Sequence, residues 1–116
     1  MLIDAVERDN VGVLLDSYHW YTTGQSVQEL ALIPLEKLVH VHLNDTLNSP
    51  EEAHDQERLL PGDGMIDLTG FLRGIQAKGY TGPLSIEVLR KQAPAEAPDV
   101  IIKHAFSLVE SLLAKL

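Results

Sequence analysis

Three side chains that can bind a metal ion each lie in, or directly after, a short apolar segment of the chain. They are Asp16, His42 and Glu87. Two carboxylates and one imidazole are donors that suit Mn²⁺ or Mg²⁺, with Co²⁺ and Zn²⁺ as alternatives. The chain contains no cysteine, so a thiolate metal site and a disulfide framework are both excluded. Three protein ligands would leave coordination positions open for a substrate.

Each of these residues also has an explanation that needs no metal. The aspartate can cap the turn that follows it. His40 and His42 share one face of a strand, and such a pair can be half-buried and satisfied by hydrogen bonds. Glu87 in an apolar segment is costly to bury unless it is paired, and Arg58 or Lys91 can be its partner. The metal site is favoured because the three residues come from three successive segments.

The elements that must position these side chains alternate between strand and helix. The expected strands are short apolar runs bounded by polar residues: 11–15, 38–43 and 84–89. The expected helices have apolar residues at helical spacing: 26–33, 68–78 and 98–116. Ser26 and Glu29 form a capping box at the start of the first helix.

Alternation of this kind predicts a parallel sheet whose connections are right-handed. An open sheet and a closed barrel both fit the pattern. In either architecture the βα loops meet at the carboxyl ends of the strands, so functional residues are expected there. The long polar loop at residues 44–64 is expected to be functional or mobile, because a structureless loop of this length is unusual in a compact domain.

Composition limits the partners and the compartment. At 116 residues, with 45% hydrophobic and 22% charged residues, the chain fits one globular domain. Nine basic residues against 17 acidic ones give a formal net charge of −8, which opposes binding to nucleic acid. No segment approaches the roughly 20 apolar residues of a membrane span, and no signal segment is recognised at the N-terminus. We therefore expect a cytoplasmic protein that binds neither nucleic acid nor membrane.

Four segments together carry a family resemblance over nearly the whole chain. They are Leu-Asp-Ser-Tyr-His at 15–19, His-Val-His-Leu-Asn-Asp at 40–45, Leu-Pro-Gly-Asp-Gly-Met-Ile-Asp at 60–67 and Gly-Tyr-Thr-Gly-Pro-Leu-Ser-Ile-Glu at 79–87. In order and context they resemble the xylose isomerase-like TIM barrels, which include sugar isomerases and epimerases. The resemblance implies an α/β fold in which residues 1–116 form the C-terminal portion of a (β/α)8 barrel. The three βα units would have parallel strands equivalent to the sixth, seventh and eighth of the barrel.

The same resemblance implies a role for each site residue. Asp16, His42 and Glu87 would bind a divalent metal, and His19 and Arg58 would contact substrate oxygens. Glu87 would also be catalytic, moving a proton beside a carbonyl during isomerisation or epimerisation of a sugar or sugar phosphate through a cis-enediolate. The family's second proton-transferring carboxylate, which is also its fourth ligand, belongs to the fifth strand. This chain is therefore expected to be inactive or weakly active by itself.

Two other functions are open. Residues 42–45 also resemble a segment of apurinic endonucleases, which would make the chain a metal-dependent phosphodiesterase. Residues 54–58 do not supply the additional ligands of that multi-metal site, and the acidic balance opposes DNA binding.

The chain can instead be a non-catalytic remnant. Open sheet edges and exposed apolar faces predict a homo-oligomer, or association with the missing barrel portion.

Overall fold

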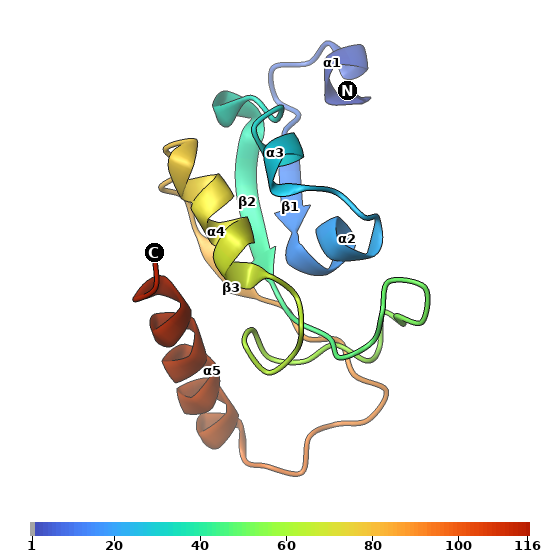
Figure 1. The fold of residues 1–116 in the computed structure, drawn as a ribbon, viewed down its shortest axis with the longest axis vertical. Coiled ribbons are helices and arrows are strands. Elements are labelled where there is room, and N and C mark those ends of the chain that lie inside the picture. Colours follow the sequence, from blue (N-terminus) through green and yellow to red (C-terminus); the bar gives the residue numbers. More distant parts are fainter. Residues whose placement is uncertain (1) are drawn as a thin grey trace.

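Three parallel strands lie side by side in the order β1-β2-β3 in the computed structural model, which describes residues 2–116 (Figure 1). The strands are β1 (Val13–Asp16), β2 (Leu38–Leu43) and β3 (Leu84–Ile86). The helices are α1 (Leu2–Val6), α2 (Ser17–Thr22), α3 (Val27–Leu30), α4 (Leu68–Ala77), α5 (Pro98–Leu113) and the 3₁₀ helix η1 (Leu35–Lys37). The predicted α/β alternation with three parallel strands is confirmed.

The register of the strands decides which side chains share a face. On β1 and β2, Leu14 lies opposite His40 and Asp16 lies opposite His42. On β2 and β3, His42 lies opposite Ser85. Because side chains alternate along a strand, the candidate ligands fall on one face of the sheet and Val41 falls on the other.

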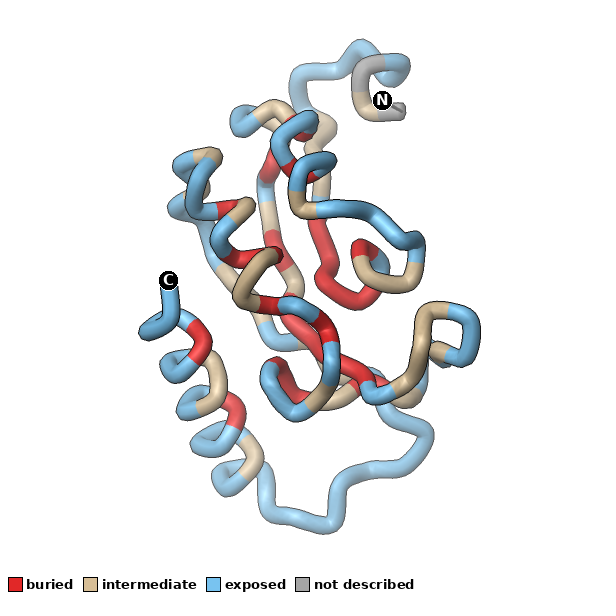
Figure 2. The backbone as a smooth tube through the Cα atoms, viewed as in Figure 1, coloured by how far each residue is buried: buried red, intermediate tan, exposed pale blue. Residues whose placement is uncertain are grey.

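The other face of the sheet carries the hydrophobic core, and α2, α3 and α4 cover it (Figures 1 and 2). The largest buried side chains of this core come from the central strand and from two helices: Val41, Leu43, Leu30, Leu68 and Phe71. Apolar burial of this kind stabilises by roughly 1.5–3 kcal/mol per large side chain. The face that carries the candidate ligands is open at β1, where Leu14 is 51% exposed.

Several predicted boundaries were wrong near the carboxyl ends of the strands. The third strand ends at Ile86 instead of residue 89, so Glu87 follows the strand rather than lying inside it. The first strand runs to Asp16, and helix α2 begins at once, although no helix was predicted there. Asp16 explains this short helix, because its carboxylate caps the helix N-terminus.

The remaining helices agree with the prediction in place but differ in length. The predicted helix at residues 26–33 contains only α3, followed by turns, although the capping box of Ser26 and Glu29 is present. The final helix ends at Leu113. The short helix α1 was not predicted. No helix within residues 2–116 is long and apolar enough to cross a membrane.

Candidate metal centre

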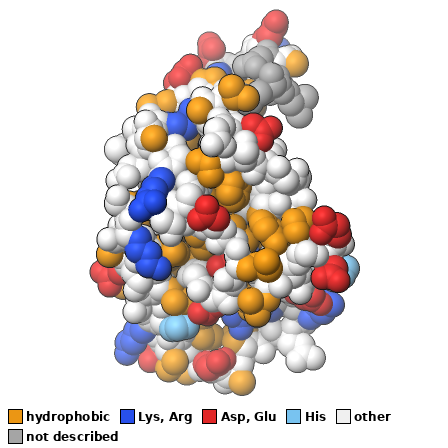
Figure 3. Space-filling model, in the orientation of Figure 1, with side chains coloured by type: hydrophobic (Ala, Val, Ile, Leu, Met, Phe, Trp, Pro, Cys, Tyr) orange, Lys and Arg blue, Asp and Glu red, His pale blue; other side chains and the backbone are white. Residues whose placement is uncertain are grey.

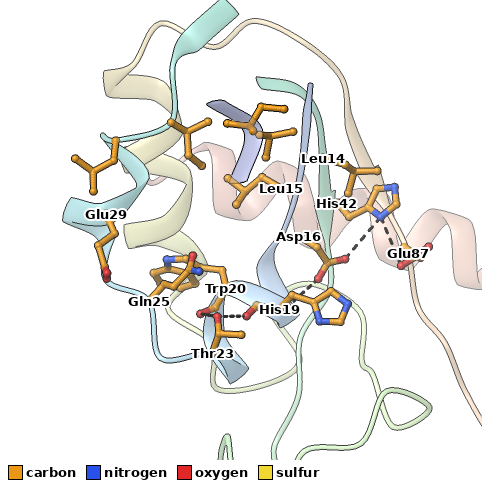
Figure 4. Close-up of a pocket in the computed structure, with 14 residues that line it drawn as sticks. Leu14, Leu15, Asp16, His19, Trp20, Thr23, Gln25, Glu29, His42 and Glu87 are labelled. Atoms are coloured by element: carbon orange, nitrogen blue, oxygen red, sulfur yellow. Dashed lines mark hydrogen bonds and ion pairs between the residues drawn. The ribbon is translucent and has the colours of Figure 1, made fainter. Parts of the chain in front are cut away.

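Asp16, His42 and Glu87 converge at the carboxyl ends of the three strands (Figure 4). His42 Nδ1 lies 3.6 Å from Asp16 Oδ2 and 3.5 Å from Glu87 Oε2. One ligand atom from each residue lies within 4.8 Å of the other two. Within residues 2–116 these are the only three His, Asp or Glu side chains grouped closely enough to hold an ion.

The spacing of the three donors fits a divalent cation. Ligand atoms about 2.1 Å from one ion are separated from each other by about 3–3.5 Å in tetrahedral or octahedral geometry. The two separations from His42 Nδ1 are close to this range. The three residues are therefore a candidate metal site by their geometry as well as their chemistry.

The two carboxylate oxygens of Asp16 have different partners. Oδ1 accepts hydrogen bonds from the backbone N–H groups of Tyr18 at 2.9 Å and His19 at 3.1 Å, so its expected capping role is confirmed. Oδ2 accepts from the Asn44 side-chain amide at 3.0 Å and faces His42. Capping thus fixes the carboxylate while leaving its second oxygen directed at the candidate metal position.

Arg58 is the cation nearest to these carboxylates, and its side chain is only 2% exposed. Its Nη1 donates to Glu87 Oε2 at 2.9 Å and lies 3.4 Å from Asp16 Oδ2. Of the two cations considered as an alternative partner of Glu87, Arg58 is the one that pairs with it. The alternative pairing with Lys91 is wrong, because Lys91 bonds Glu57 at 2.6 Å.

The charges around Arg58 act on its pKa and on that of Asp55. Burial lowers the pKa of Arg58, but the hydrogen bond to Asp55 and the charges of Asp16 and Glu87 outweigh it and raise the pKa overall. Arg58 Nη2 donates to Asp55 Oδ1 at 2.8 Å, and this bond holds the pKa of Asp55 below its usual value. Arg58 is therefore a fixed positive charge at the edge of the centre.

His19 lies beside this guanidinium at the mouth of the centre. Its Nε2 is 3.4 Å from Arg58 Nη2, and an arginine can only donate, so His19 Nε2 is the acceptor. The guanidinium carbon Cζ of Arg58 lies over the Tyr18 ring, 4.6 Å from the ring centroid. Burial, followed by the charge of Asp55, raises the pKa of Tyr18. The structure thus brings both predicted substrate-contacting residues to the predicted ligands.

Asn44 and Asp45 support the centre, although the sequence reading gave them no separate role. Asn44 is fully buried, and its side chain connects Asp16 with the hydroxyl of Ser17, which donates to Asn44 Oδ1 at 2.8 Å. Asp45 accepts from the backbone N–H groups of Gly62 and Ile66, both at 3.0 Å. The signal that could have revealed them is a pair of polar residues directly after an apolar strand.

Asp45 also orders the loop that was predicted to be functional or mobile. Its backbone pairs with that of Leu59 in an isolated antiparallel bridge, which brings the preceding residue, Arg58, to the strand ends. Gly64 passes so close to Asp45 that a side chain there would collide with it. Residues 44–64 are therefore folded against the centre in the structure.

A cavity of about 620 Å³ opens beside the three candidate ligands (Figure 4). Its wall contains the three ligands and His19 at one end. Leu14 lines it beside His42, and Trp20, Gln25 and Glu29 line it on the side away from His42 and Glu87. The volume is in the range of small-molecule sites, and polar side chains line the cavity both at the candidate ligands and at Thr23, Gln25 and Glu29.

Comparison with known proteins places this arrangement in a family. The family model described as xylose isomerase-like TIM barrel matches residues 1–110. The chain belongs to this family. The resemblance drawn from the four sequence segments is thereby confirmed.

Two solved structures align with nearly all of the chain. A xylose isomerase domain protein from Alicyclobacillus acidocaldarius is 46% identical, with a TM-score of 0.90, and the alignment covers 97% of this chain and 40% of that one. The protein IOLI, solved with a bound zinc atom, is 28% identical with a TM-score of 0.88. The alignment covers 98% of this chain and 41% of IOLI. The three strands thus align with part of a TIM barrel.

Two curated relatives indicate the chemistry found in the xylose isomerase-like family. Inosose isomerase of Halalkalibacterium halodurans is 30% identical over 115 residues, which are 98% of this chain and 41% of the relative. The 3-dehydroshikimate dehydratase of Pseudomonas aeruginosa is 35% identical over 105 residues, and the match covers 83% of this chain and 16% of the relative. The chain therefore spans well under half the length of these relatives, and it is related to both isomerases and dehydratases.

Proposed function

We propose that residues 1–116 supply three metal ligands and one catalytic carboxylate to a divalent-metal-dependent isomerase of a sugar, a sugar phosphate or an inosose-like compound. In this proposal the strands are equivalent to the sixth, seventh and eighth of a (β/α)8 barrel. The observation that carries it is the convergence of Asp16, His42 and Glu87 at three adjacent strand ends. The remaining strands, including the one that carries the second carboxylate, complete the site.

The proposed ion is held by one oxygen of Asp16, Nδ1 of His42 and one oxygen of Glu87. Mn²⁺ and Mg²⁺ suit this donor set, and the zinc-bound relative supports testing Zn²⁺ together with Co²⁺. When bound, such an ion supplies Lewis acidity, which polarises a carbonyl and an adjacent hydroxyl. The residues of the chain itself perform the remaining steps.

Glu87 is the proposed base that removes a proton from carbon beside the carbonyl and returns it at the neighbouring position. Its side chain is 40% exposed, so it can reach a substrate in the cavity. Arg58 holds a substrate oxygen and stabilises the negative charge that develops as the proton leaves. His19, at the mouth, orients a substrate hydroxyl.

Dehydration is a second candidate, and the relationship to 3-dehydroshikimate dehydratase favours it. An isomerase returns the proton to carbon, whereas a dehydratase loses water after the same kind of proton removal, so both need a base such as Glu87.

Phosphodiester cleavage has less support. Within residues 2–116 a single potential metal group is found, whereas the endonuclease reading needs a multi-metal site. Lys and Arg side chains are scattered on the face seen in Figure 3 and form no basic stripe there.

The test is calorimetric titration of the purified chain with Mn²⁺, Mg²⁺, Co²⁺ and Zn²⁺. We expect one ion per chain, with binding lost in His42→Ala and Glu87→Gln but kept in the matched controls His104→Ala and Glu110→Gln. The controls replace exposed residues of α5. A folded chain that binds no ion would contradict the proposal and support the non-catalytic remnant.

Catalysis is then tested by NMR in D₂O, with aldoses, ketoses, inosose and 3-dehydroshikimate as substrates. Exchange of the proton beside the carbonyl, lost in Glu87→Gln, is the result expected of the proposed base. Release of water without exchange back to substrate would favour the dehydratase. The assay is run with the chain alone and with the remaining barrel portion of a relative added, because the proposed second carboxylate lies there.

A further inference from the structure

We propose that His40 is a positioning residue that, together with Ser85, holds the imidazole of His42 in the orientation needed to bind the metal. This inference rests on the proposed metal site and adds two residues to it. Neither residue lies in the group of candidate ligands. On the same face of the sheet, His40 lies one step before His42, and Ser85 lies opposite His42 and one step before Glu87.

Two diagonal contacts between the second and third strand segments repeat the same offset. His42, which lies opposite Ser85, contacts Glu87 two residues further on, with 3.5 Å between Nδ1 and Oε2. His40, two residues before His42, is hydrogen-bonded through Nε2 to Ser85 Oγ at 2.8 Å, and Ser85 lies two residues before Glu87. Because side chains on one face recur every second residue, the His40–Ser85 contact lies beside the His42–Glu87 contact on the same face. The His40–Ser85 bond ties β2 to β3 beside the two candidate ligands.

His40 also contacts the ring of His42 directly. The ring centroids are 5.1 Å apart and the ring planes are inclined by 88°, which is an edge-to-face contact. A rotation of the His42 ring would drive it into this neighbour, and the bond to Ser85 prevents His40 from moving aside. The contact therefore limits the tilt of the His42 ring, while the two carboxylates favour the flip that turns Nδ1 towards Asp16 and Glu87.

The packing of His40 against His42 takes the place of the hydrogen bond that usually orients a metal-binding histidine. A histidine that binds a metal is normally oriented by a hydrogen bond from its second ring nitrogen to a carboxylate or carbonyl. Both polar contacts of the His42 ring within residues 2–116 are made by Nδ1. Packing against His40 is thus the feature of the described structure that supports the His42 ring on the side away from the strand ends.

Three variants separate the hydrogen bond from the ring contact. Ser85→Ala removes only the bond, His40→Phe removes the bond but keeps an aromatic ring, and His40→Ala removes both. Loss of an outer support typically weakens metal binding about 10- to 100-fold. We expect His40→Ala to show such a loss in Mn²⁺ or Co²⁺ titration, and the other two variants a smaller loss. The double variant His40→Ala/Ser85→Ala should bind no more weakly than His40→Ala, because both residues act through one contact.

Two readouts distinguish positioning from other roles. The visible spectrum of bound Co²⁺ should keep its band pattern in His40→Ala, because the ligand set is unchanged. A changed pattern would make His40 a ligand and overturn the inference. Thermal unfolding of the metal-free variants should match the wild type as closely as that of the exposed control Ser107→Ala, whereas a large loss of stability would point to a purely structural role.

A measurement on the metal-free chain keeps the test independent of the proposed function. Proton NMR should show Overhauser contacts between the rings of His40 and His42 in the wild type, and these should weaken in Ser85→Ala. If the wild type binds no ion but shows this behaviour, the metal proposal fails and the positioning contact stands. Absence of the ring contacts, or wild-type metal affinity in His40→Ala, would overturn the inference.

Discussion

Arg58 Nη1 lies 2.9 Å from Glu87 Oε2, so the proposed catalytic carboxylate is paired with a nearly fully buried cation that comes from the loop after β2. The same nitrogen lies 3.4 Å from Asp16 Oδ2. These are also the two carboxylate oxygens that face His42 Nδ1. One guanidinium thus holds two candidate ligands together and compensates their charge.

Arg58→Met should destabilise the metal-free chain, because it leaves the two carboxylates close together without a cation. We expect a loss of about 3 kcal/mol in urea unfolding, at the low end for breaking a buried ion pair, since Glu87 is 40% exposed. Added Mn²⁺ should restore more stability to the variant than to the wild type. The control is Arg90→Met at an exposed position, and an equal effect of the two substitutions would contradict the assignment.

Asn44→Ala should weaken both the fold and the metal site. The asparagine is fully buried and joins Asp16 to Ser17, so truncation leaves buried polar groups without partners, at a cost of about 1–3 kcal/mol. Metal affinity should fall about tenfold, because Asp16 loses an outer partner. Denaturant unfolding and calorimetry measure the two effects. The exposed Asn10→Ala is the control, and unchanged metal affinity in Asn44→Ala would argue against a supporting role.

Asp55→Asn should remove part of the pH dependence of stability. The bond from Arg58 holds the pKa of Asp55 below its usual value of 3.8. A folded-state pKa below the unfolded one gives stabilisation that is complete above the unfolded pKa and is lost as pH falls through the folded one. The variant should therefore be less stable than the wild type at neutral pH, with the difference closing below about pH 4. Urea unfolding at several pH values checks this, with Asp9→Asn as the control.

The chain should associate in solution at micromolar concentration. The edges of β1 and β3 are unpaired within the described sheet, and Leu14 on its open face is 51% exposed. Sedimentation should give a mass above that of one chain, and Leu14→Lys should lower it. Leu47→Lys, at a loop residue that is 67% exposed, is the matched control. A monomeric wild type would refute this prediction.

The three strands could be predicted from local sequence patterns. Apolar runs define β1, β2 and β3, and a capping box defines the start of α3, because these features depend on neighbours in the sequence. The short helix α2 was missed because its six residues have no helical periodicity of their own. It forms because Asp16 satisfies its first N–H groups, a contact that a pattern of apolar residues does not reveal.

The sequence by itself determined the family, the alternation of strand and helix, and the residue types available to a metal. Parallel strands place their carboxyl ends together, so it also indicated that Asp16, His42 and Glu87 would converge. Only the tertiary structure decided between Arg58 and Lys91 as the partner of Glu87 and placed His40 against His42. Arg58 and Glu87 are 29 positions apart, and the Ser85 that holds His40 is 45 positions from it, so these contacts depend on strand register and loop path, which local sequence does not fix.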